Sequence, residues 1–407
     1  TTSSVCTPTR YGILTGRYNW RSPLKKSVLF PPRKSIMDPG RQTVAGFLKE
    51  RGYRTSVVGK WHLGLNWHML DQPAKAAEGP TRGTCWNIDF SRPPQQGPLK
   101  LGFTDDFLFP ASLDMAPYLY LRNDVATGIP TVSKGWNRQG PATADFEATT
   151  CLVDFARESR AFIRSAAESK TPFFLYLPLT SPHTPIVPSE KWRGKSPLGP
   201  YGDFVMETDW VVGEVMKELA ERQVAENTLL LFTTDNGCSP AAGIPKLIEK
   251  GHHPNANWRG HKADIYEGGH RVPFLVRWPE RVQANSSCDL TVCTTDFFAT
   301  VAEILGVHGR KFPPHTAEDS FSFVGALDQP ERRTPIRPYT IHHSINGSFA
   351  IRKGPWKLCL CPGSGGWSSP RPAQALKNKT LAAIQLFHLG ADPSERNNLQ
   401  AEHPHIV

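Results

Sequence analysis

The chain has 407 residues, and 39% hydrophobic and 10% aromatic content is enough to fill a sizeable core. This length favours one large domain and one small domain. Apolar runs stay well short of the ~20 residues that a membrane helix needs. We therefore expect no membrane-spanning segment and no membrane partner. The formal charge of +10 favours acidic partners, but no helix-turn-helix, zinc-finger or single-strand-binding pattern occurs, so nucleic acid is not expected.

The first part of the chain alternates predicted helices and strands. Residues 43–53 predict a helix, because Val44, Phe47 and Leu48 recur at helical spacing and Gly52 suits a helix C-terminus. Residues 54–64 predict a strand that runs into a loop. Residues 71–100 are rich in Pro, Gly and Gln and predict a long surface insertion.

The alternation continues beyond the insertion. We predict helices over residues 144–167, 204–223 and 295–306, and strands over residues 172–179, 228–237 and 272–279. Short continuous apolar strands between helices are typical of strands that are buried on both faces. The sequence therefore predicts an α/β fold whose mostly parallel sheet is sandwiched by helices.

The tail has a different pattern. Residues 348–361 predict a hairpin and residues 384–389 a further strand, with a Gly/Ser/Pro-rich stretch between them. We therefore expect an α/β catalytic domain over 1–334 and a small C-terminal antiparallel α+β subdomain over 335–407. The eight cysteines include no pair of CxxC motifs, and Cys359 and Cys361 are interpreted as buried free thiols.

Four polar groups directly follow predicted strands: "GKWHLG" at 59–64, "SPHTP" at 181–185, "TTDNG" at 233–237 and "WRGHKADIYEGGHRVPF" at 258–274. Each has a plainer explanation alone, as a structural histidine, a turn or a surface lysine. Together they are expected at the carboxyl ends of the strands, where α/β sheets gather function. Lys60 and His62 share a face if the strand continues through them.

This set of residue types indicates a class of chemistry. Asp235 and Asn236 offer only oxygen ligands, which suits a hard cation such as Ca²⁺ or Mg²⁺. Lysines and histidines would clamp an anion. A hard cation, lysines and a nucleophile suit the transfer of a sulfuryl or phosphoryl group, because negative charge on the leaving oxygen must be stabilised.

At this point the chain resembles a known family. "CTPTRYGILTGR" at 6–17 is similar to the type I sulfatase signature, Cys-x-Pro-x-Arg followed by Thr-Gly-Arg, and "GKWHLG" is similar to the second signature. The other motifs follow in the family's order, and "LFHLGADPSERNNL" resembles its closing segment. The resemblance, which spans essentially the whole chain, is to the formylglycine-dependent, arylsulfatase-like sulfatases of the alkaline phosphatase superfamily.

The resemblance implies a modified nucleophile. In that family a maturation enzyme oxidises the motif cysteine to formylglycine, whose hydrate attacks sulfur and is also a metal ligand; this places both roles on Cys6. Arg10 is then expected to steady the hydrate, and Lys60 to contact the hydrate and the sulfate.

The remaining roles are carried over in the same way. His62 is expected to take a hydroxyl proton, His183 to protonate the leaving alcohol, and Lys262 to hold the sulfate and the leaving oxygen. Asp235 and Asn236 are expected to bind the cation, which the resemblance implies is Ca²⁺, with Mg²⁺ as the alternative. An unperturbed histidine pKa of ~6.5 suits both proton roles.

One part of the family pattern is absent. A pair of adjacent aspartates on the strand before the cysteine motif completes the family's metal site, but this chain starts five residues before Cys6. We therefore expect an N-terminally truncated sequence that lacks the first strand. The resemblance implies a secreted protein in a periplasmic, extracellular or lysosomal location, with the signal segment outside the chain. His261, beside Lys262, is left open between lining the substrate pocket and a structural role.

The substrate class is a further expectation. The hydrophilic insertions, the basic balance and the aromatic residues Trp67 and Trp258 with His68 near the motifs favour a sulfated carbohydrate as substrate. Two alternatives remain open: a phosphonate or phosphate monoester hydrolase of the same superfamily, and an inactive glycan-binding fragment.

Overall fold

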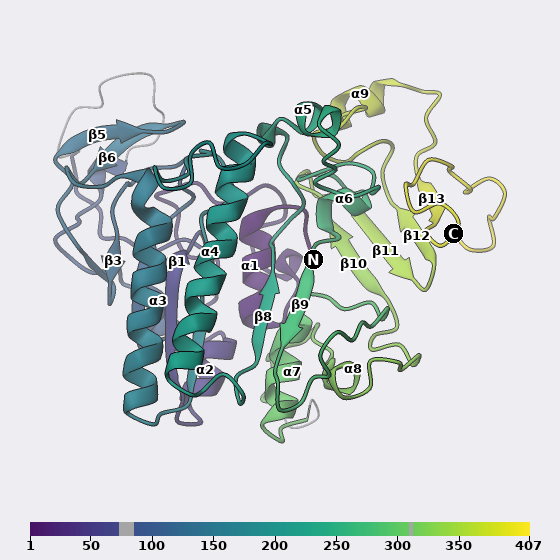
Figure 1. The fold of residues 1–407 in the computed structure, drawn as a ribbon. Helices are drawn as coiled ribbons and strands as arrows, with labels where there is room; N and C mark the ends of the chain where they lie inside the picture. The colour runs from purple at the N-terminus through teal and green to yellow at the C-terminus, as the bar shows by residue number, and fades with distance from the viewer. Residues whose placement is uncertain (73–84, 309–311) are drawn as a thin grey trace. The chain divides into compact units, whose positions relative to one another are not determined.

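The computed structural model describes residues 1–72, 85–308 and 312–407 (Figure 1). The chain forms two compact units. The first unit contains residues 1–28 and 227–407, and the second unit contains residues 29–226. The predicted boundary at residue 335 stays a prediction. Among the described residues, no helix combines the length and the apolar character that crossing a bilayer requires.

The second unit is built on a five-stranded sheet. Its order is β4 (Val125–Ala126), β3 (Leu121–Arg122), β2 (Asp105–Phe109), β1 (Arg54–Lys60) and β7 (Phe173–Tyr176). β1 runs parallel to both β2 and β7, whereas β3 and β4 extend the sheet with antiparallel pairs. The predicted α/β class is therefore confirmed, with a sheet that is mixed rather than mostly parallel.

Helices cover this sheet because their apolar stripes need a surface to pack on. α2 (Val44–Lys49) begins after Thr43, whose hydroxyl accepts the Gly46 N–H at 3.0 Å. α3 (Cys151–Glu168) buries Leu152, Phe155, Phe162 and related residues on one stripe, and α4 (Pro200–Glu221) lies beside it (Figure 1). The helix predicted from residue 144 begins only at Cys151, after a 3₁₀ turn at Ala148–Thr150.

The predicted surface insertion is only partly a surface loop. Residues 73–84 lie outside the described residues. Trp86, Ile88 and Phe90 are buried, and 3₁₀ turns form at Cys85–Asn87 and Pro98–Leu101. The prediction was wrong for this part, because Pro and Gly here shape a packed turn around three large apolar side chains. A hairpin of β5 (Val132–Gly135) and β6 (Gln139–Ala142) was not predicted.

The first unit begins with α1 (Cys6–Thr15), which packs on α7 (Asp296–Ile304). β8 (Leu230–Thr233) pairs antiparallel with β9 (Phe274–Arg277). Both strands were predicted, but a short apolar run carries no information about strand direction. Short helices α5 (Ile244–Glu249), α6 (Glu267–His270) and α8 (Val324–Asp328) fill the connections.

A four-stranded antiparallel sheet ends the first unit. It consists, in chain order, of β10 (Thr340–His343), β11 (Phe349–Lys353), β12 (Trp356–Cys359) and β13 (Gln385–His388). The predicted hairpin and the predicted last strand are confirmed; β10 and the short helix α9 (Pro372–Lys377) were not predicted. Cys359 and Cys361 are buried free thiols, as predicted.

A buried group of charges fastens the closing segment to this sheet. The Lys357 ammonium on β12 lies 3.0 Å from a Glu267 carboxylate oxygen and 2.8 Å from one of Glu395. All three side chains are 2% exposed or less. The segment that resembles the family's closing motif is thus held through Glu395 to β12 and to α6.

Candidate active site

The cysteine motif forms the start of α1. Cys6 is the first helical residue, after an extended Val5, and only 3% of its surface is exposed. Arg10 follows one turn later, so both side chains lie on the same helix face. The segment before the motif is held in place because Ser4 accepts the Ala263 N–H at 2.8 Å.

Arg10 connects this helix to the segment that follows β8. Its Nε donates to Asp235 Oδ2 at 2.8 Å, and its Nη2 lies 2.7 Å from the same oxygen. Both side chains are largely buried, so the ion pair is screened little by solvent. The structure therefore brings together two of the predicted site residues that are 225 residues apart in the sequence.

Asn236 lies next in this segment and is 9% exposed. Its Nδ2 donates to the Gly237 carbonyl at 2.9 Å, but within the described part of the chain its buried Oδ1 has no hydrogen-bond partner. A Cβ at Gly237 would lie 1.8 Å from the Gly268 carbonyl oxygen. Only glycine fits there, so close packing against the 260–270 loop explains why a glycine follows Asn236. This Asn-Gly pair therefore does not mark the hairpin turn that such pairs usually form.

Lys262 is held by its backbone in a turn of that loop. Its N–H donates to the Cys238 carbonyl at 2.9 Å, and the next carbonyl, of Ala263, accepts the Ile345 N–H at 3.1 Å. The residue is 5% exposed, yet no hydrogen bond or ion pair within residues 1–72, 85–308 and 312–407 engages its ammonium. An ammonium that no group of the described chain engages is available to an anion, so this lysine suits an anionic ligand.

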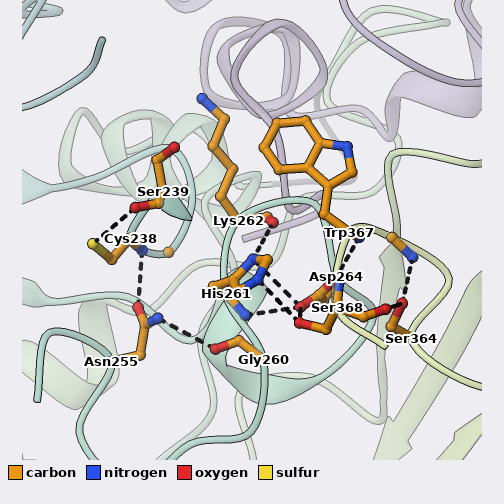
Figure 2. Close-up of polar contacts among 12 residues, drawn as sticks. Cys238, Ser239, Asn255, Gly260, His261, Lys262, Asp264, Ser364, Trp367 and Ser368 are labelled. Carbon is orange, nitrogen blue, oxygen red and sulfur yellow. Dashed lines mark hydrogen bonds and ion pairs between the residues drawn. The ribbon is translucent and has the colours of Figure 1, made fainter. Parts of the chain in front are cut away.

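His261 has a structural role. Its Nδ1 lies 2.9 Å from the Lys262 carbonyl oxygen, and its Nε2 lies 3.1 Å from Ser368 Oγ (Figure 2). Both ring nitrogens are therefore engaged by the protein. These contacts support the structural role that the sequence left open, because they fix the Lys262 turn.

In the second unit, Lys60 is the last residue of β1. Its N–H donates to the Pro178 carbonyl at 2.6 Å, which continues the pairing of β1 with the chain after β7. The side chain is 2% exposed. Burial opposes ionisation of Asp114, but the Ser112 hydroxyl and the positive charges of Lys60 and Arg138 hold the pKa of this carboxyl below its usual range. Asp114 is thus an electrostatic neighbour of Lys60 that the motifs do not include.

His62 does not continue the strand. Its φ of 55° lies in the left-handed region, so the argument that it shares a strand face with Lys60 does not apply. The 2% exposed imidazole places Nε2 at 2.9 Å from the Leu29 carbonyl oxygen. Because a carbonyl only accepts, Nε2 carries the proton, and Nδ1 is the accepting nitrogen of the neutral ring.

A pocket of the second unit opens beside this histidine. Apolar and aromatic residues dominate it, with two ionisable side chains, and it is lined by Leu29, Phe30, Pro31, Arg33, His62, Gly64, Leu65, Trp67, Pro110, Ala111 and Pro117. Trp67, one of the aromatics singled out in the sequence, is therefore pocket-lining. Trp258 belongs to the first unit instead, where the Arg271 guanidinium carbon lies 3.8 Å from the centre of the Trp258 ring.

His183 lies in the segment that follows β7 and is half-buried. Its Nδ1 is 2.6 Å from the Thr184 carbonyl oxygen. This contact assigns the proton of the neutral ring to Nδ1, so Nε2 is the nitrogen that gains or donates a further proton.

A comparison with known proteins shows the family of this chain. The profile of the sulfatase family matches residues 1–307, about three quarters of the chain. The chain belongs to the sulfatase family. The resemblance drawn from the cysteine motif and the four later motifs is thus confirmed.

Individual relatives support the assignment over the whole sulfatase chain. An N-acetylgalactosamine-6-O-sulfatase from Bacteroides thetaiotaomicron is 32% identical over 100% of this chain and 82% of the relative. A steryl-sulfatase from Homo sapiens is 30% identical over 98% of this chain and 76% of the relative. A solved structure from B. thetaiotaomicron, described under the metabolism of multiple glycosaminoglycans, matches 100% of this chain and 88% of its own, with a TM-score of 0.83 and 31% identity. The sulfatase is thus an enzyme of the sulfuric ester hydrolase class.

Sequence reasoning missed residues that support the site of this sulfatase. Asp264 is fully buried and accepts hydrogen bonds from His261 N and from the 367–368 backbone, which belongs to the Gly/Ser/Pro-rich stretch (Figure 2). The sequence signal was present only in part. The carboxyl lies two residues after Lys262, but nothing local shows that a segment a hundred residues later contacts it.

Proposed function

We propose that this sulfatase hydrolyses sulfate monoesters of carbohydrates. The observation that carries the proposal is Lys262, a 5% exposed residue whose ammonium has no partner among the described residues and whose backbone is hydrogen-bonded to Cys238, just after Asp235 and Asn236. The carbohydrate assignment is supported by the sugar sulfatase relative at 32% identity and by the glycosaminoglycan context of the similar structure. The steryl-sulfatase relative makes a steroid ester the competing substrate.

The nucleophile of this proposal is a formylglycine formed from Cys6 by a maturation enzyme. Cys6 supports it by its position one turn before Arg10, on a helix face whose arginine is already fixed by Asp235. The hydrated aldehyde supplies an oxygen nucleophile for sulfur and releases sulfate when it returns to the aldehyde. Arg10 orients this group, and Lys60 contacts the sulfate.

The proposal also includes a divalent cation, Ca²⁺ or Mg²⁺. The donor chemistry fits: Asn236 Oδ1 is a buried acceptor without a hydrogen-bond partner in the described chain, and Asp235 adds a carboxylate. Within the described residues no group of three His, Cys, Asp or Glu side chains is arranged to hold a metal, so these two residues supply part of the ligand set. A bound cation would stabilise negative charge on the sulfate oxygens.

Two histidines handle the protons. His62 keeps its Nε2 proton on the Leu29 carbonyl, so Nδ1 accepts the hydroxyl proton in the elimination step. His183 keeps its Nδ1 proton on the Thr184 carbonyl, so Nε2 donates to the leaving oxygen. Lys262 binds the sulfate and stabilises the leaving oxygen. The location outside the cytoplasm stays the prediction that the family resemblance makes.

The test is a substrate panel with protein co-expressed with a formylglycine-generating enzyme. We expect hydrolysis of N-acetylgalactosamine 6-sulfate and of an aryl sulfate, little hydrolysis of an aryl phosphate, and conversion of the Cys6 thiol to an aldehyde in the tryptic peptide. The Cys6→Ala variant, which keeps its circular dichroism spectrum, should be inactive.

Each alternative has its own outcome in this panel. Faster turnover of aryl phosphate would support the phosphonate or phosphate hydrolase. Turnover of steryl sulfate without the sugar sulfate would support a steroid substrate. Sugar binding without any turnover by the aldehyde-containing protein would support the glycan-binding alternative.

A further inference from the structure

The loop between β12 and α9 presents an aromatic side chain to solvent. Trp367 lies in the stretch "PGSGGWSSPRP" and is 39% exposed. Its indole makes no hydrogen bond, ring contact or cation contact with the described part of the chain. The backbone contacts of this loop show how firmly the indole is positioned.

The loop is fixed to the turn that carries Lys262. The buried Asp264 carboxylate accepts the Trp367 N–H at 2.8 Å and the Ser368 N–H at 3.0 Å on Oδ1. Its Oδ2 accepts the His261 N–H at 3.0 Å and also the Ser368 hydroxyl. One carboxylate therefore determines the positions of Lys262 and Trp367 relative to each other (Figure 2).

Further contacts remove the remaining freedom of the loop backbone. Ser364 Oγ donates to the Ser368 carbonyl at 2.7 Å, and the Ile265 N–H donates to the Ser364 carbonyl at 2.8 Å. A Cβ at Gly366 would lie 2.4 Å from the Ala263 carbonyl oxygen, so the two segments approach as closely as only a glycine allows. The exposed indole is thus mounted on a rigid support.

The indole and the Lys262 side chain project on the same side of the Asp264 cluster (Figure 2). An anion bound at the ammonium would therefore have the group that carries it near the indole face. The indole's surroundings are polar: Ser364, Ser368 and His261 lie around the loop, and Arg371 Nε donates to the Trp367 carbonyl at 3.0 Å. A ligand here would have one apolar face and a rim that hydrogen-bonds.

We propose that the Trp367 indole is the stacking surface for the sugar ring whose sulfate ester is bound by Lys262. A pyranose has the required shape, with C–H groups on one face and hydroxyls around its edge, whereas a steroid would need a continuous apolar surface. This inference rests on the proposed carbohydrate sulfatase function. Trp367 selects the sugar and takes no part in the transfer of the sulfuryl group.

The test measures binding without turnover, with the Cys6→Ala protein as the reference. Isothermal titration calorimetry would give the Kd of N-acetylgalactosamine 6-sulfate and of inorganic sulfate for this reference and for Trp367→Ala in the same background. We expect the sugar sulfate to bind about 10-fold more weakly to Trp367→Ala, which corresponds to the loss of one aromatic contact. The Kd of inorganic sulfate should stay the same, because Lys262 is untouched.

Two further variants make the result specific. Trp367→Phe, which keeps a smaller aromatic face, should recover part of the sugar affinity. Tyr339→Ala removes another exposed aromatic of the first unit, 45% exposed, and should leave both affinities unchanged. Tyr339 precedes β10, at the opposite end of that strand from Ile345, whose N–H contacts the Lys262 turn.

The outcomes separate this inference from the proposed function. A reference protein that binds inorganic sulfate but no sugar sulfate overturns both. A reference protein that binds the sugar sulfate, with Trp367→Ala binding it equally well, overturns the stacking role alone. Equal weakening for sugar sulfate and inorganic sulfate would assign the indole to the shape of the anion site, which contradicts the proposal.

Discussion

Two guanidinium nitrogens of Arg10 contact the same carboxylate oxygen of Asp235, Nε at 2.8 Å and Nη2 at 2.7 Å. The arginine lies one turn after Cys6 on α1, and the aspartate follows β8. The contact fixes the cysteine motif relative to the proposed cation ligands, across 225 residues of sequence. It also places a permanent positive charge beside a proposed metal-binding carboxylate, which limits the negative charge that the cation meets.

This geometry predicts that Arg10→Lys is not a conservative change. An ammonium cannot reproduce the planar two-nitrogen contact, so Asp235 should lose its fixed orientation. We expect kcat/KM to fall at least ~10-fold, since small misplacements in an active site are costly. Steady-state kinetics on an aryl sulfate would measure the effect.

The control for this variant is Arg21→Lys. Arg21 binds Asp319 with Nε and Nη2, both at 2.8 Å, in the same unit, but its side chain is 48% exposed and lies outside the motifs. It should leave kcat/KM unchanged. Similar losses in both variants would indicate a general effect on folding instead of a role for Arg10 at the site.

The His183 assignment predicts a dependence on the leaving group. His183→Ala should slow esters of poorly acidic alcohols by ~10²–10⁴-fold, the usual contribution of a general acid. Activated aryl sulfates should be affected much less, because their leaving oxygen needs no proton. The measurement is kcat/KM for a series of sulfate esters against leaving-group pKa. An equal loss along the series would mean that His183 only binds the sulfate.

Helices and strands that bury a face were predictable from the sequence. α3 and α4 show their apolar stripes directly, and β8 is a short apolar run that follows α4. The short strands β3 and β4 were not predicted, because two-residue strands have no periodicity to detect. Strand direction was also hidden, which is why the antiparallel pairing of β8 with β9 was missed.

The candidate site, like the fold, was predicted from the sequence only in part. Lys60 and Asp235 were proposed from their motifs at the ends of predicted strands, but those strands belong to two different sheets, β1 to the five-stranded sheet and β8 to the pair with β9. Trp367 was not found, because a Gly/Ser/Pro-rich stretch predicts a flexible connection. Its order comes from Asp264 and from the close approach at Gly366, which are tertiary contacts without a local signal.

A pair of buried carboxyls in the second unit predicts a pH-dependent stability. The Asp124 N–H donates to Asp106 Oδ2 at 2.9 Å. Burial, and then the neighbouring charge of Asp124, raises the pKa of Asp106 to about 7, and burial raises the pKa of Asp124 to about 6. In the unfolded chain an aspartate ionises near 3.8. The folded state therefore keeps protons that the unfolded state has lost, and stability should fall as the pH rises from about 4 to about 7.

Asp106→Asn should remove most of this loss. The amide stays neutral, accepts the Asp124 N–H and leaves one carboxyl to ionise. We expect it to raise the free energy of unfolding by on the order of 2 kcal/mol at pH 8 and by little at pH 4. Urea unfolding at both pH values, with the exposed Asp145→Asn as control, checks this. A gain of the same size at both pH values would rule out the carboxyl charge as the cause.

The buried charges around Lys357 yield the last prediction. The ammonium is fully buried between Glu267 and Glu395, and Glu395 Oε2 also accepts the Glu267 N–H at 2.6 Å. Lys357→Met would leave two carboxylates facing each other without the cation, which typically costs ~3–5 kcal/mol. Glu267 opens α6, and the next residue, Gly268, packs against Gly237 beside the proposed cation ligands. Lys357→Met should therefore lower both the thermal unfolding midpoint and the sulfatase activity.

Two further variants serve as controls for this prediction. The double variant Lys357→Met with Glu395→Gln removes one of the two carboxylate charges and should recover part of the stability, whereas the exposed Lys353→Met should change neither property. If Lys357→Met costs less than ~1 kcal/mol, or if the double variant is less stable than the single one, the ammonium does not hold the closing segment in the way described.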